Sequence, residues 1–399
     1  MRGRRRRRPD LGSKHPLYVK PREGSPWDEG WGRFHFQLMR RRTFLKTLGA
    51  AVATAPVALN SWAQAIPAAP APVVELPPFA PRVPDIPFDA PAGSWTLVVL
   101  PDTQNMAKDF PAAYIRQTEW IVAHQRRHDI RFVIHEGDIT NNNTPDQWQN
   151  AREAMRRLSD AGIAYALLPG NHDLGPDGKC ADRTTLLNDY FDARDYRHSR
   201  RVGYFESGRM ENSWHDVATP AGDLLVVALE FGPRDAVLAW ANDVIARHPA
   251  HWVIVVTHAH LYSDDTRFDL EKFGPNQKWN PRTYPLAVRV EAGGTNDGEQ
   301  VWQKLVTRHR NIRFVLNGHV LNDGAARLVS VGEHGQPVHQ ILANYQAAVE
   351  PRRPYGGGGY LRLMQFLPDR RTVRVKTYSP WLDAWLTEPE QQFNLSVSA

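Results

Sequence analysis

The sequence predicts an α/β fold whose strands and helices form layers around one core. Three observations support this prediction. Beyond Gly93, apolar runs of strand length alternate with segments whose apolar residues recur at helical spacing. The chain has 399 residues, of which 42% are hydrophobic, so it can bury a substantial core and is neither a peptide nor a wholly disordered chain. We see no internal repeat, and the alternation therefore describes a single layered domain.

Six apolar runs predict strands, and they lie at 95–100, 131–134, 163–168, 224–229, 252–256 and 312–316. Between them, apolar residues at helical spacing predict four helices, marked by Tyr114/Ile121 with Ile115/Val122, by Trp148, Ala151, Met155 and Leu158, by Val237, Ala241 and Val244, and by Val301/Leu305 with Trp302/Val306. From Arg327 to about Thr377 the pattern predicts further strands, with a flexible turn at Gly356 to Gly359.

The start of one helix carries a specific signal. Thr144 is followed by Pro145 and, three residues on, by Gln147, which is the pattern of a capping box with proline in the first turn. We therefore expect a helix that begins after Thr144. By contrast, the segments 174–220 and 261–299 are long and weakly periodic, which predicts functional loops and not core elements.

Charge and cysteine content exclude several classes of protein. The net charge is +6, but residues 1–65 hold 14 Lys and Arg against four Asp and Glu, so residues 66–399 hold 35 basic and 39 acidic side chains. Because the basic excess belongs to the N-terminal leader, we expect no nucleic-acid partner. The single cysteine, Cys180, excludes an intramolecular disulfide and a cysteine-rich zinc module. No run of 18 apolar residues occurs, so no conventional membrane-spanning helix is expected.

The residues before the folded part predict an export signal. Residues 41–46, Arg-Arg-Thr-Phe-Leu-Lys, resemble the twin-arginine signal, and they precede thirteen uncharged residues at 47–59 and an A-x-A cleavage pattern at 63–65. The alternative, an ordinary amphipathic helix, leaves the cleavage pattern unexplained. We therefore expect the twin-arginine export machinery as a partner, a periplasmic or secreted location, and no permanent membrane anchor.

Four segments are expected along the chain. Translation from Met39 would give the export signal a normal start, so residues 1–38 are interpreted as an upstream extension, with a nucleic-acid-binding arm as the alternative. Residues 39–65 form the signal peptide. Residues 66–92 form a linker, because nine prolines lie between Ile66 and Pro91. Residues 93–399 form the folded domain.

Polar residues that can bind metals follow five of the predicted strands. They are Asp102-Thr103-Gln104, Gly137-Asp138, Gly170-Asn171-His172-Asp173, Thr257-His258 and Asn317-Gly318-His319. A lone aspartate in such a place is usually a helix cap, and a lone histidine is usually a core residue. Five such groups in succession are instead typical of a site at the carboxyl ends of the strands.

This set combines carboxylates, a carboxamide and imidazoles with no thiolate, which suits Mn²⁺, Fe or Zn²⁺ and disfavours a structural zinc site. Two ions that share one carboxylate would lie about 3.5–4 Å apart, generate hydroxide at neutral pH, and hold both the attacking and the leaving oxygen of a phosphoryl displacement. The sequence therefore predicts divalent metal ions as cofactors, two of them if one carboxylate is shared.

The order D-x-Q, G-D, G-N-H-D, H and G-H resembles the calcineurin-like metallophosphoesterases, whose pattern is D-x-H, GDxxD, GNHD/E, H and GHxH. The resemblance spans Leu97 to Val320. It implies a β-sandwich of two sheets flanked by helices, in four α/β/β/α layers, and a small phosphoester as the substrate.

The resemblance also implies a role for each motif residue. Asp102 and Gln104 would bind metal one, and Asp138 would bridge both metals. Metal two would be bound by Asp138, Asn171, His258 and His319. His172 would face the phosphoryl oxygens or the leaving group, while Asp173 would fix the tautomer of His172 and raise its basicity.

Three departures from the family pattern concern metal one and its surroundings. Gln104 stands where most members have histidine, Leu321 stands at the second histidine of GHxH, and Asn141 stands at the last position of GDxxD. The D-x-Q order looks like that of the manganese-dependent ADP-ribose/CDP-alcohol diphosphatase branch. Because glutamine is a neutral oxygen ligand and leucine cannot ligate, metal one is expected to be weaker, exchangeable or rich in oxygen ligands, which favours manganese.

The expected function is that of an exported phosphoesterase that hydrolyses phosphate esters by attack of metal-bound hydroxide. Two alternatives stay open. One is a phosphodiesterase or pyrophosphatase acting on nucleotide-type substrates. The other is a metal-binding protein with impaired catalysis, which the residues Gln104 and Leu321 motivate and the intact Asn171-His172-Asp173 run argues against.

Overall fold

The structure is a computed structural model that describes residues 88–288, 294–346 and 354–397. The predicted upstream extension, the signal peptide and most of the proline-rich linker lie outside these residues. Among the described helices, none combines the length and the apolar character that crossing a membrane would require.

The first of two sheets has seven strands in the order β13-β12-β11-β1-β2-β3, with β14 paired to β12. Strands β1 to β3 run parallel to one another, and β11 lies antiparallel to β1. The strands are β1 (Trp95–Leu100), β2 (Ile130–His135), β3 (Tyr165–Ala166), β11 (Leu361–Phe366), β12 (Thr372–Ser379), β13 (Ala384–Leu386) and β14 (Phe393–Ser396).

The second sheet also has seven strands, in the order β4-β5-β6-β7-β8-β10-β9. Its central strands β6, β7, β8 and β10 are parallel, and β4, β5 and β9 are antiparallel to their neighbours. The strands are β4 (Arg201–Tyr204), β5 (Ser213–Thr219), β6 (Gly222–Leu229), β7 (Trp252–Thr257), β8 (Ile312–Asn317), β9 (Ala325–Val331) and β10 (Pro337–Ala343).

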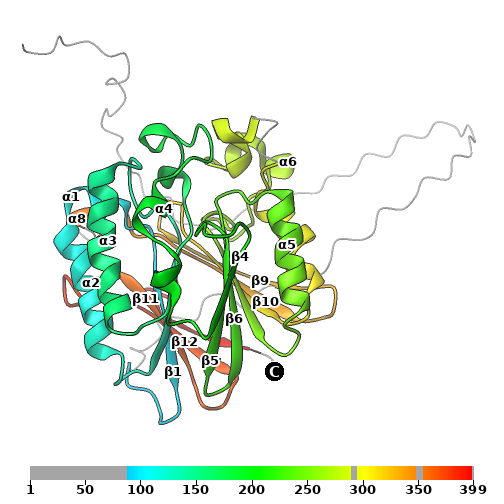
Figure 1. The fold of residues 1–399 in the computed structure, drawn as a ribbon. Coiled ribbons are helices and arrows are strands. Elements are labelled where there is room, and N and C mark those ends of the chain that lie inside the picture. Colours follow the sequence, from blue (N-terminus) through cyan, green and yellow to red (C-terminus); the bar gives the residue numbers. More distant parts are fainter. Residues whose placement is uncertain (1–87, 289–293, 347–353, 398–399) are drawn as a thin grey trace, which may run out of the picture. The chain divides into compact units, whose positions relative to one another are not determined.

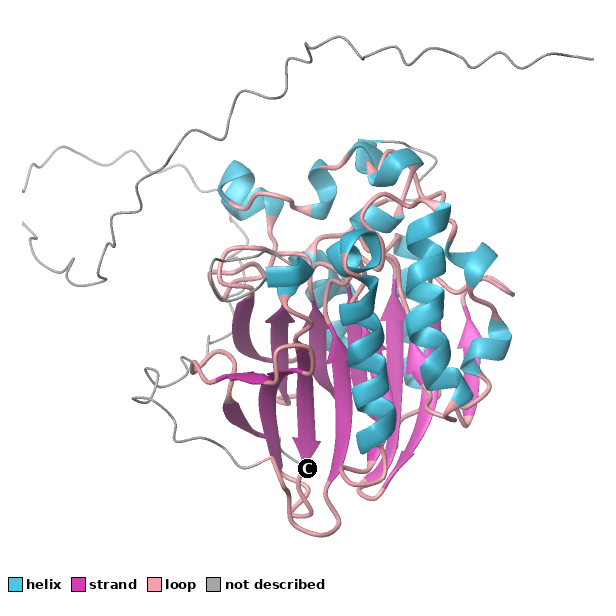
Figure 2. Cartoon of the chain, turned by 90° about the vertical axis from the view of Figure 1, so that its left-hand side faces the viewer, coloured by secondary structure: helices cyan, strands magenta, loops and turns pink. Residues whose placement is uncertain are grey.

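The two sheets pack face to face and helices cover their outer faces (Figures 1 and 2). Alternation along β1 produces this layering, because Leu97 and Val99 enter the core between the sheets while Val98 and Leu100 pack under the helices. The first sheet is covered by α1 (Gln104–Asp109), α2 (Pro111–His124) and α3 (Pro145–Asp160), and the second by α5 (Asp235–Ala246) and α7 (Gly298–Lys304). The predicted four α/β/β/α layers are confirmed.

Two expected elements are shorter than predicted. The run 163–168 pairs only at Tyr165–Ala166, because it forms an edge strand with a single neighbour. The helix expected through Val306 ends at Lys304 and continues as a short 3-10 helix, Val306–Arg308.

The expected turn at Gly356 to Gly359 is present, since all four glycines have positive φ, but its first two residues end the short helix α8 (Pro354–Gly357).

The predicted capping box of α3 is wrong, although the helix begins at Pro145 as expected. The Thr144 side chain makes no capping bond and instead donates to Asp146 Oδ1. Gln147 Oε1 accepts the backbone N–H groups of Asn141 and Asn142, at 2.8 and 2.9 Å. The Gln147 side chain therefore accepts hydrogen bonds from the loop that follows β2 and does not cap its own helix.

The expectation of loop throughout 174–220 is also corrected, because this segment contains α4 (Leu187–Tyr190) and the strands β4 and β5. The apolar pattern of β5 is broken by buried polar residues that find partners. His215 lies between the hydroxyls of Ser199 and Ser213, both 2.9 Å away. In 261–299 the described helix is the short α6 (Leu270–Phe273), with 3-10 turns around it.

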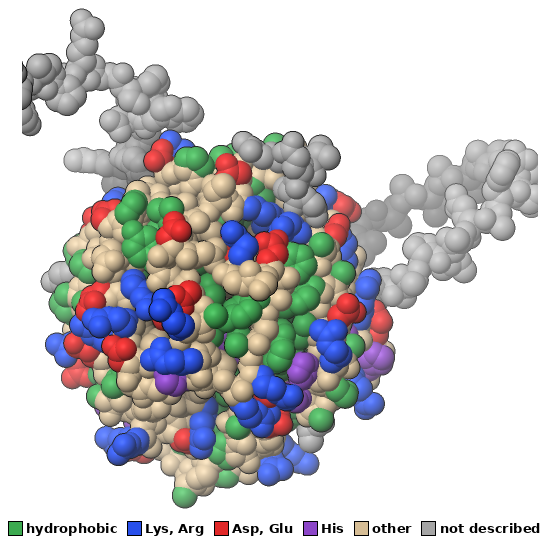
Figure 3. Space-filling view, in the orientation of Figure 1, with side chains coloured by type: hydrophobic (Ala, Val, Ile, Leu, Met, Phe, Trp, Pro, Cys, Tyr) green, Lys and Arg blue, Asp and Glu red, His purple; other side chains and the backbone are tan. Residues whose placement is uncertain are grey.

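On the face shown in Figure 3, Lys and Arg side chains are interspersed with Asp and Glu side chains. This mixture matches the near balance of 35 basic and 39 acidic residues in 66–399. The described surface on this side therefore presents neighbouring charges of both signs.

Candidate metal centre

The five predicted motifs meet at one edge of the two sheets. They follow β1, β2 and β3 in the first sheet and β7 and β8 in the second, and the carboxyl ends of these parallel strands lie together. The six predicted metal ligands are all buried, with at most 5% of any residue exposed: Asp102, Gln104, Asp138, Asn171, His258 and His319.

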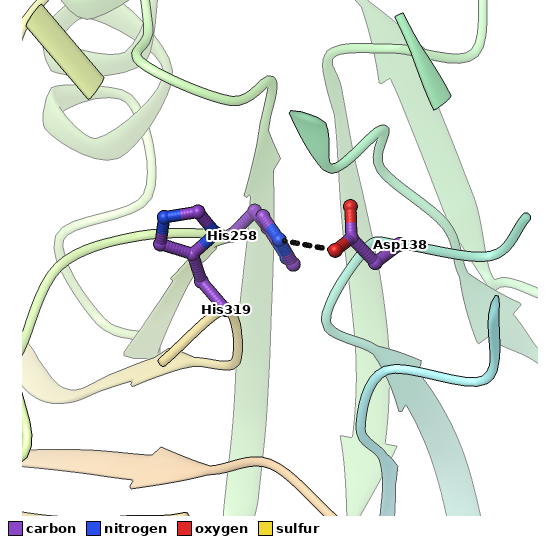
Figure 4. Close-up of side chains that lie close together, drawn as sticks. All are labelled: Asp138, His258 and His319. Carbon is purple, nitrogen blue, oxygen red and sulfur yellow. Dashed lines mark ion pairs between the residues drawn. The ribbon is translucent and has the colours of Figure 1, made fainter. Parts of the chain in front are cut away.

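Three of these side chains form the centre of the arrangement. Asp138, His258 and His319 each offer a ligand atom, and these atoms all lie within 4.8 Å of one another. His258 Nε2 is 3.2 Å from Asp138 Oδ2, and His319 lies beside His258 (Figure 4). The structure thus brings together, from both sheets, the three strongest predicted ligands of metal two.

Both imidazoles are oriented by backbone carbonyls. His258 Nδ1 lies 2.7 Å from the carbonyl of Glu136, and His319 Nε2 lies 2.8 Å from the carbonyl of Trp279. A carbonyl can only accept, so each of these nitrogens donates a proton to it, and the other ring nitrogen is the atom that would bind a metal. Because Trp279 belongs to the segment 261–299, this loop takes part in building the site, as the sequence led us to expect.

Close backbone approaches explain the glycines of the motifs. A Cβ atom on Gly170 would lie 2.1 Å from Asp138 Oδ1, and one on Gly318 would lie 2.0 Å from Asp102 Oδ1. Asp138 and His319 themselves have positive φ, at 49° and 74°. Such backbone geometry costs about 1–3 kcal/mol per residue and is typical of functional sites, where the surrounding structure holds it in place.

Burial and neighbouring charges shift the pKa values of the ionisable groups in the centre. Burial raises the pKa of Asp102 to about 8, and the nearby Asp138 adds to the rise. Burial alone would also raise the pKa of Asp138, but His258 and His172 bring it below its usual range. Burial lowers the pKa of His258, yet the two carboxylates outweigh burial and raise it to about 9. Burial and the charge of His258 lower the pKa of His319 to about 3. A positive charge is therefore favoured where the carboxylates face His258.

The Asp102 side of the centre consists of oxygen atoms. Both Asp102 oxygens lie near the backbone N–H of His319, at 3.2 and 3.1 Å, and Oδ2 accepts from Asn344 Nδ2 at 2.9 Å. Gln104 Oε1 and Asn171 Oδ1 are buried acceptors with no hydrogen-bond donor among the described residues. An acceptor buried without a donor loses its hydration, and a metal cation would compensate for that loss. The donor set therefore fits divalent ions.

The structure corrects the role expected for Asp173. Its carboxylate accepts hydrogen bonds from the backbone N–H groups of Ile139, Thr140 and Gly170 and from the Thr140 hydroxyl, at 2.7 to 2.9 Å. These bonds tie the loop after β2 to the loop after β3. The ring of His172 is instead held by the carbonyl of Asn141, which is 2.9 Å from Nδ1. Asp173 thus shapes the loops and does not orient His172.

Two kinds of contributor were missed by the sequence analysis. The carbonyls of Glu136 and Trp279 carry no sequence signal, because every residue has a carbonyl group. Asn344 did have a signal: it follows the apolar run 341–343, just as the other site residues follow their strands.

A second group of possible metal ligands lies at the opposite ends of the strands. Asp216, Asp223 and His251 have ligand atoms within 4.8 Å of one another. However, Arg200 contacts both carboxylates, at 2.5 Å from Asp216 and 2.8 Å from Asp223, and Arg201 is 2.8 Å from Asp216. Guanidinium groups already neutralise this cluster, so we interpret it as an ion-pair network.

Comparisons with known proteins agree with this arrangement. The family model of the calcineurin-like phosphoesterases matches residues 96–323. The uncharacterized protein YvnB of Bacillus subtilis (strain 168) is 30% identical over 297 residues, which are 72% of this chain but only 20% of that protein. The chain therefore spans about a fifth of the length of this relative.

Solved structures with a similar fold include two distant proteins. The purple acid phosphatase PPD1 from yellow lupin seeds has a TM-score of 0.43 and 13% identity, over 78% of this chain and 55% of that one. GAP50, the anchor in the inner membrane complex of Plasmodium, has a TM-score of 0.42 and 12% identity, over 77% of this chain and 90% of that one. Since the family model matches more than half of the sequence, the chain belongs to the calcineurin-like phosphoesterase family.

Proposed function

We propose that the protein is a hydrolase that cleaves phosphate esters with the help of two divalent metal ions. One observation carries the proposal: Asp138, His258 and His319 converge within 4.8 Å, and in each imidazole one ring nitrogen lies against a carbonyl, which leaves the other nitrogen as the ligand atom. A buried histidine that served packing alone would need no such convergence with a carboxylate from the other sheet.

The residues would divide between the ions as follows. Asp102, Gln104 and the shared Asp138 would hold one ion, and Asp138 would hold the other together with Asn171, His258 and His319. When bound, divalent ions lower the pKa of water and neutralise charge on the phosphoryl oxygens. The first group offers only oxygen atoms, which favours Mn²⁺ over Zn²⁺ at that position.

His172 would then move a proton to the leaving oxygen. Its backbone N–H donates to Asp138 Oδ1 at 2.9 Å, which fixes the residue beside the metals. Its ring donates Nδ1–H to the Asn141 carbonyl, so Nε2 is the atom left for the substrate and would have to carry the proton that passes to the leaving oxygen. His172 is only partly buried, unlike the ligands, and its ring can therefore meet a substrate that enters from solvent.

Turnover of p-nitrophenyl phosphate and of its bis ester, with added Mn²⁺, tests the proposal, together with metal analysis of the same sample. His258→Ala should abolish turnover and lower the metal content. His260→Asn is the matched control, because His260 is also buried but bonds Gln340 at 2.9 Å. Equal activity in the two variants would overturn the proposal, and metal binding without any turnover would favour the metal-binding alternative. Activity restricted to nucleotide diphosphates would favour the pyrophosphatase alternative.

We also propose that the protein is exported by the twin-arginine route, on the strength of residues 41–46 and the A-x-A pattern at 63–65. N-terminal sequencing of protein recovered outside the cytoplasm should then begin near Ile66. Arg41→Lys combined with Arg42→Lys should keep the protein inside the cell. Recovery of a chain that still carries the arginines at 4–8 would contradict this proposal.

A further inference from the structure

Asn344 joins the two sheets at the candidate metal centre. Asp102 follows β1 of the first sheet, whereas Asn344 follows β10 of the second. Because β10 runs parallel to β8, with Leu342 opposite Asn317, Asn344 emerges at the same edge as His319. Asn344 is 2% exposed, and its Nδ2 donates to Asp102 Oδ2 at 2.9 Å.

The orientation of the Asn344 amide is fixed by its neighbours. Gln346 donates its backbone N–H to Asn344 Oδ1 at 2.9 Å, so the NH₂ group must face Asp102. The backbone N–H of Asn344 donates to the Gly324 carbonyl at 2.9 Å, which holds the residue in place. The carboxamide therefore has one orientation, in which its NH₂ group donates to the Asp102 carboxylate.

The same short segment also holds the helix that carries Gln104. Asn105 Nδ2 donates to the Gln346 carbonyl at 3.0 Å, and Asn105 is the second residue of α1. Residues 344–346 thus contact both parts of the chain that would hold metal one, namely Asp102 and the start of α1. They follow β10 of the second sheet, just as His258 and His319 follow β7 and β8 of that sheet.

The hydrogen bonds distinguish the two oxygens of Asp102. Among the donors that other described residues supply, Oδ2 lies near two, the His319 N–H at 3.1 Å and Asn344 Nδ2 at 2.9 Å, whereas Oδ1 lies near the His319 N–H alone, at 3.2 Å. A carboxylate oxygen has two lone pairs, so Oδ1 keeps one for a cation. The carboxamide of Asn344 is neutral and adds this constraint without a competing charge.

We propose that Asn344 is a positioning residue that holds Asp102 for the metal ion of the Asp102/Gln104 side. The inference rests on the proposed function, since it requires that an ion bind there. The contribution matters more on this side because Leu321 supplies no ligand. Hydrogen-bond partners of metal ligands typically change metal affinity by about 10–100-fold when they are removed.

Calorimetric titration of the metal-free full chain with MnCl₂ tests the proposal. Asn344→Ala should weaken the lower-affinity class of site by about tenfold or more and leave the higher-affinity class unchanged. Asn344→Leu keeps the volume without the donor and should do the same, which separates the hydrogen bond from packing. Asn311→Ala is the matched control, because Asn311 is 8% exposed and donates two hydrogen bonds of 3.0 Å at the far end of β8.

The thermal unfolding midpoint of each metal-free variant is measured alongside. If Asn344→Ala and Asn311→Ala lower the midpoint equally but only the former weakens Mn²⁺ binding, Asn344 acts on the metal side. Unchanged binding in both Asn344 variants, or equal weakening in the Asn311 control, would overturn the inference and leave the proposed function standing. A wild-type chain that binds no Mn²⁺ would overturn both.

Discussion

The two sides of the candidate metal centre offer different ligand atoms. On one side, His258 and His319 each offer one imidazole nitrogen as a ligand, and the other nitrogen of each ring bonds a backbone carbonyl. On the other side, Asp102 and Gln104 offer only oxygens, and Leu321 occupies the position where the family pattern has another histidine. Imidazole bonds are strong and directional, whereas a neutral amide oxygen is a weaker ligand that tolerates exchange. For the two ions that we propose, we therefore expect the imidazole side to retain its ion and the oxygen side to exchange it.

The groups that hold the ligands in place also differ between the two sides. The imidazole side is held by main-chain carbonyls and by positive φ at His319 and Asp138, which the fold imposes. The oxygen side is held by the backbone N–H of His319 and, in addition, by side-chain amides, since Asn344 donates to Asp102 and Asn105 bonds the Gln346 carbonyl from the start of α1. A single substitution can remove an amide but cannot remove a carbonyl. The oxygen side is therefore the one whose affinity substitutions can tune gradually.

The largest effect is expected for the imidazole side. His319→Ala removes a directional ligand, and the more tightly held ion should be lost together with activity, by about a thousandfold or more. His319→Gly should lose the ion equally but unfold at a higher temperature than His319→Ala, because glycine tolerates the φ of 74°. Metal analysis and initial rates check the first outcome, and calorimetric unfolding checks the second. Retention of two ions in either variant would contradict the assignment.

The second prediction separates chemistry from metal retention. His172→Ala should keep the full metal content while kcat falls by about two to four orders of magnitude, because the backbone and not the ring contacts Asp138. Single-turnover rates and metal analysis of the same preparation measure this.

Asp173→Asn provides the contrast to that variant. Its carboxylate joins two loops through four hydrogen bonds, so this change should lower the unfolding temperature, which His172→Ala should leave nearly unchanged. If metal and activity fall together in His172→Ala, the residue holds a metal and does not act on the substrate.

Much of this arrangement could be predicted from the sequence, and the failures have physical reasons. The strand at 95–100 and the central strands β6 to β8 were predicted because uninterrupted apolar runs mark strands that are buried on both faces. Strand β5 was not predicted because Ser213, His215 and Asp216 are polar and buried. Ser213 bonds His215 within the strand, and His215 and Asp216 bond Ser199 and Arg200 in the segment before β4. Periodicity alone cannot distinguish such a strand from a loop.

In the candidate site, too, some features could be predicted from the sequence and others could not. Residue types and strand ends predicted which side chains meet, since those depend on topology. The partner of each side chain depends on local loop geometry, and there the expectation failed for Asp173, which binds backbone N–H groups in the loop after β2. Backbone carbonyls, such as that of Trp279, leave no trace in a sequence at all.

A smaller effect is expected from partial chelation. Dialysis against a chelator should remove about one equivalent of metal first, from the Asp102/Gln104 side, because its ligands are fewer and lack nitrogen. Added Mn²⁺ should then restore the activity. Metal content and rate are followed along the same dialysis series. Simultaneous loss of both equivalents would mean that the two sides hold their ions equally well.

The smallest effect tests the difference between the sides directly. Gln104 Oε1 is buried and has no donor among the described residues, so it is available to a metal. Gln104→His replaces this neutral oxygen with an imidazole nitrogen, which should tighten the weaker class by about tenfold and shift its preference from Mn²⁺ toward Zn²⁺. Gln104→Glu keeps an oxygen but adds charge, so it should tighten binding without changing the preferred metal. Competitive titration with the two ions measures both affinities. If neither variant moves the weaker class, Gln104 is not a ligand, and the two sides differ for another reason.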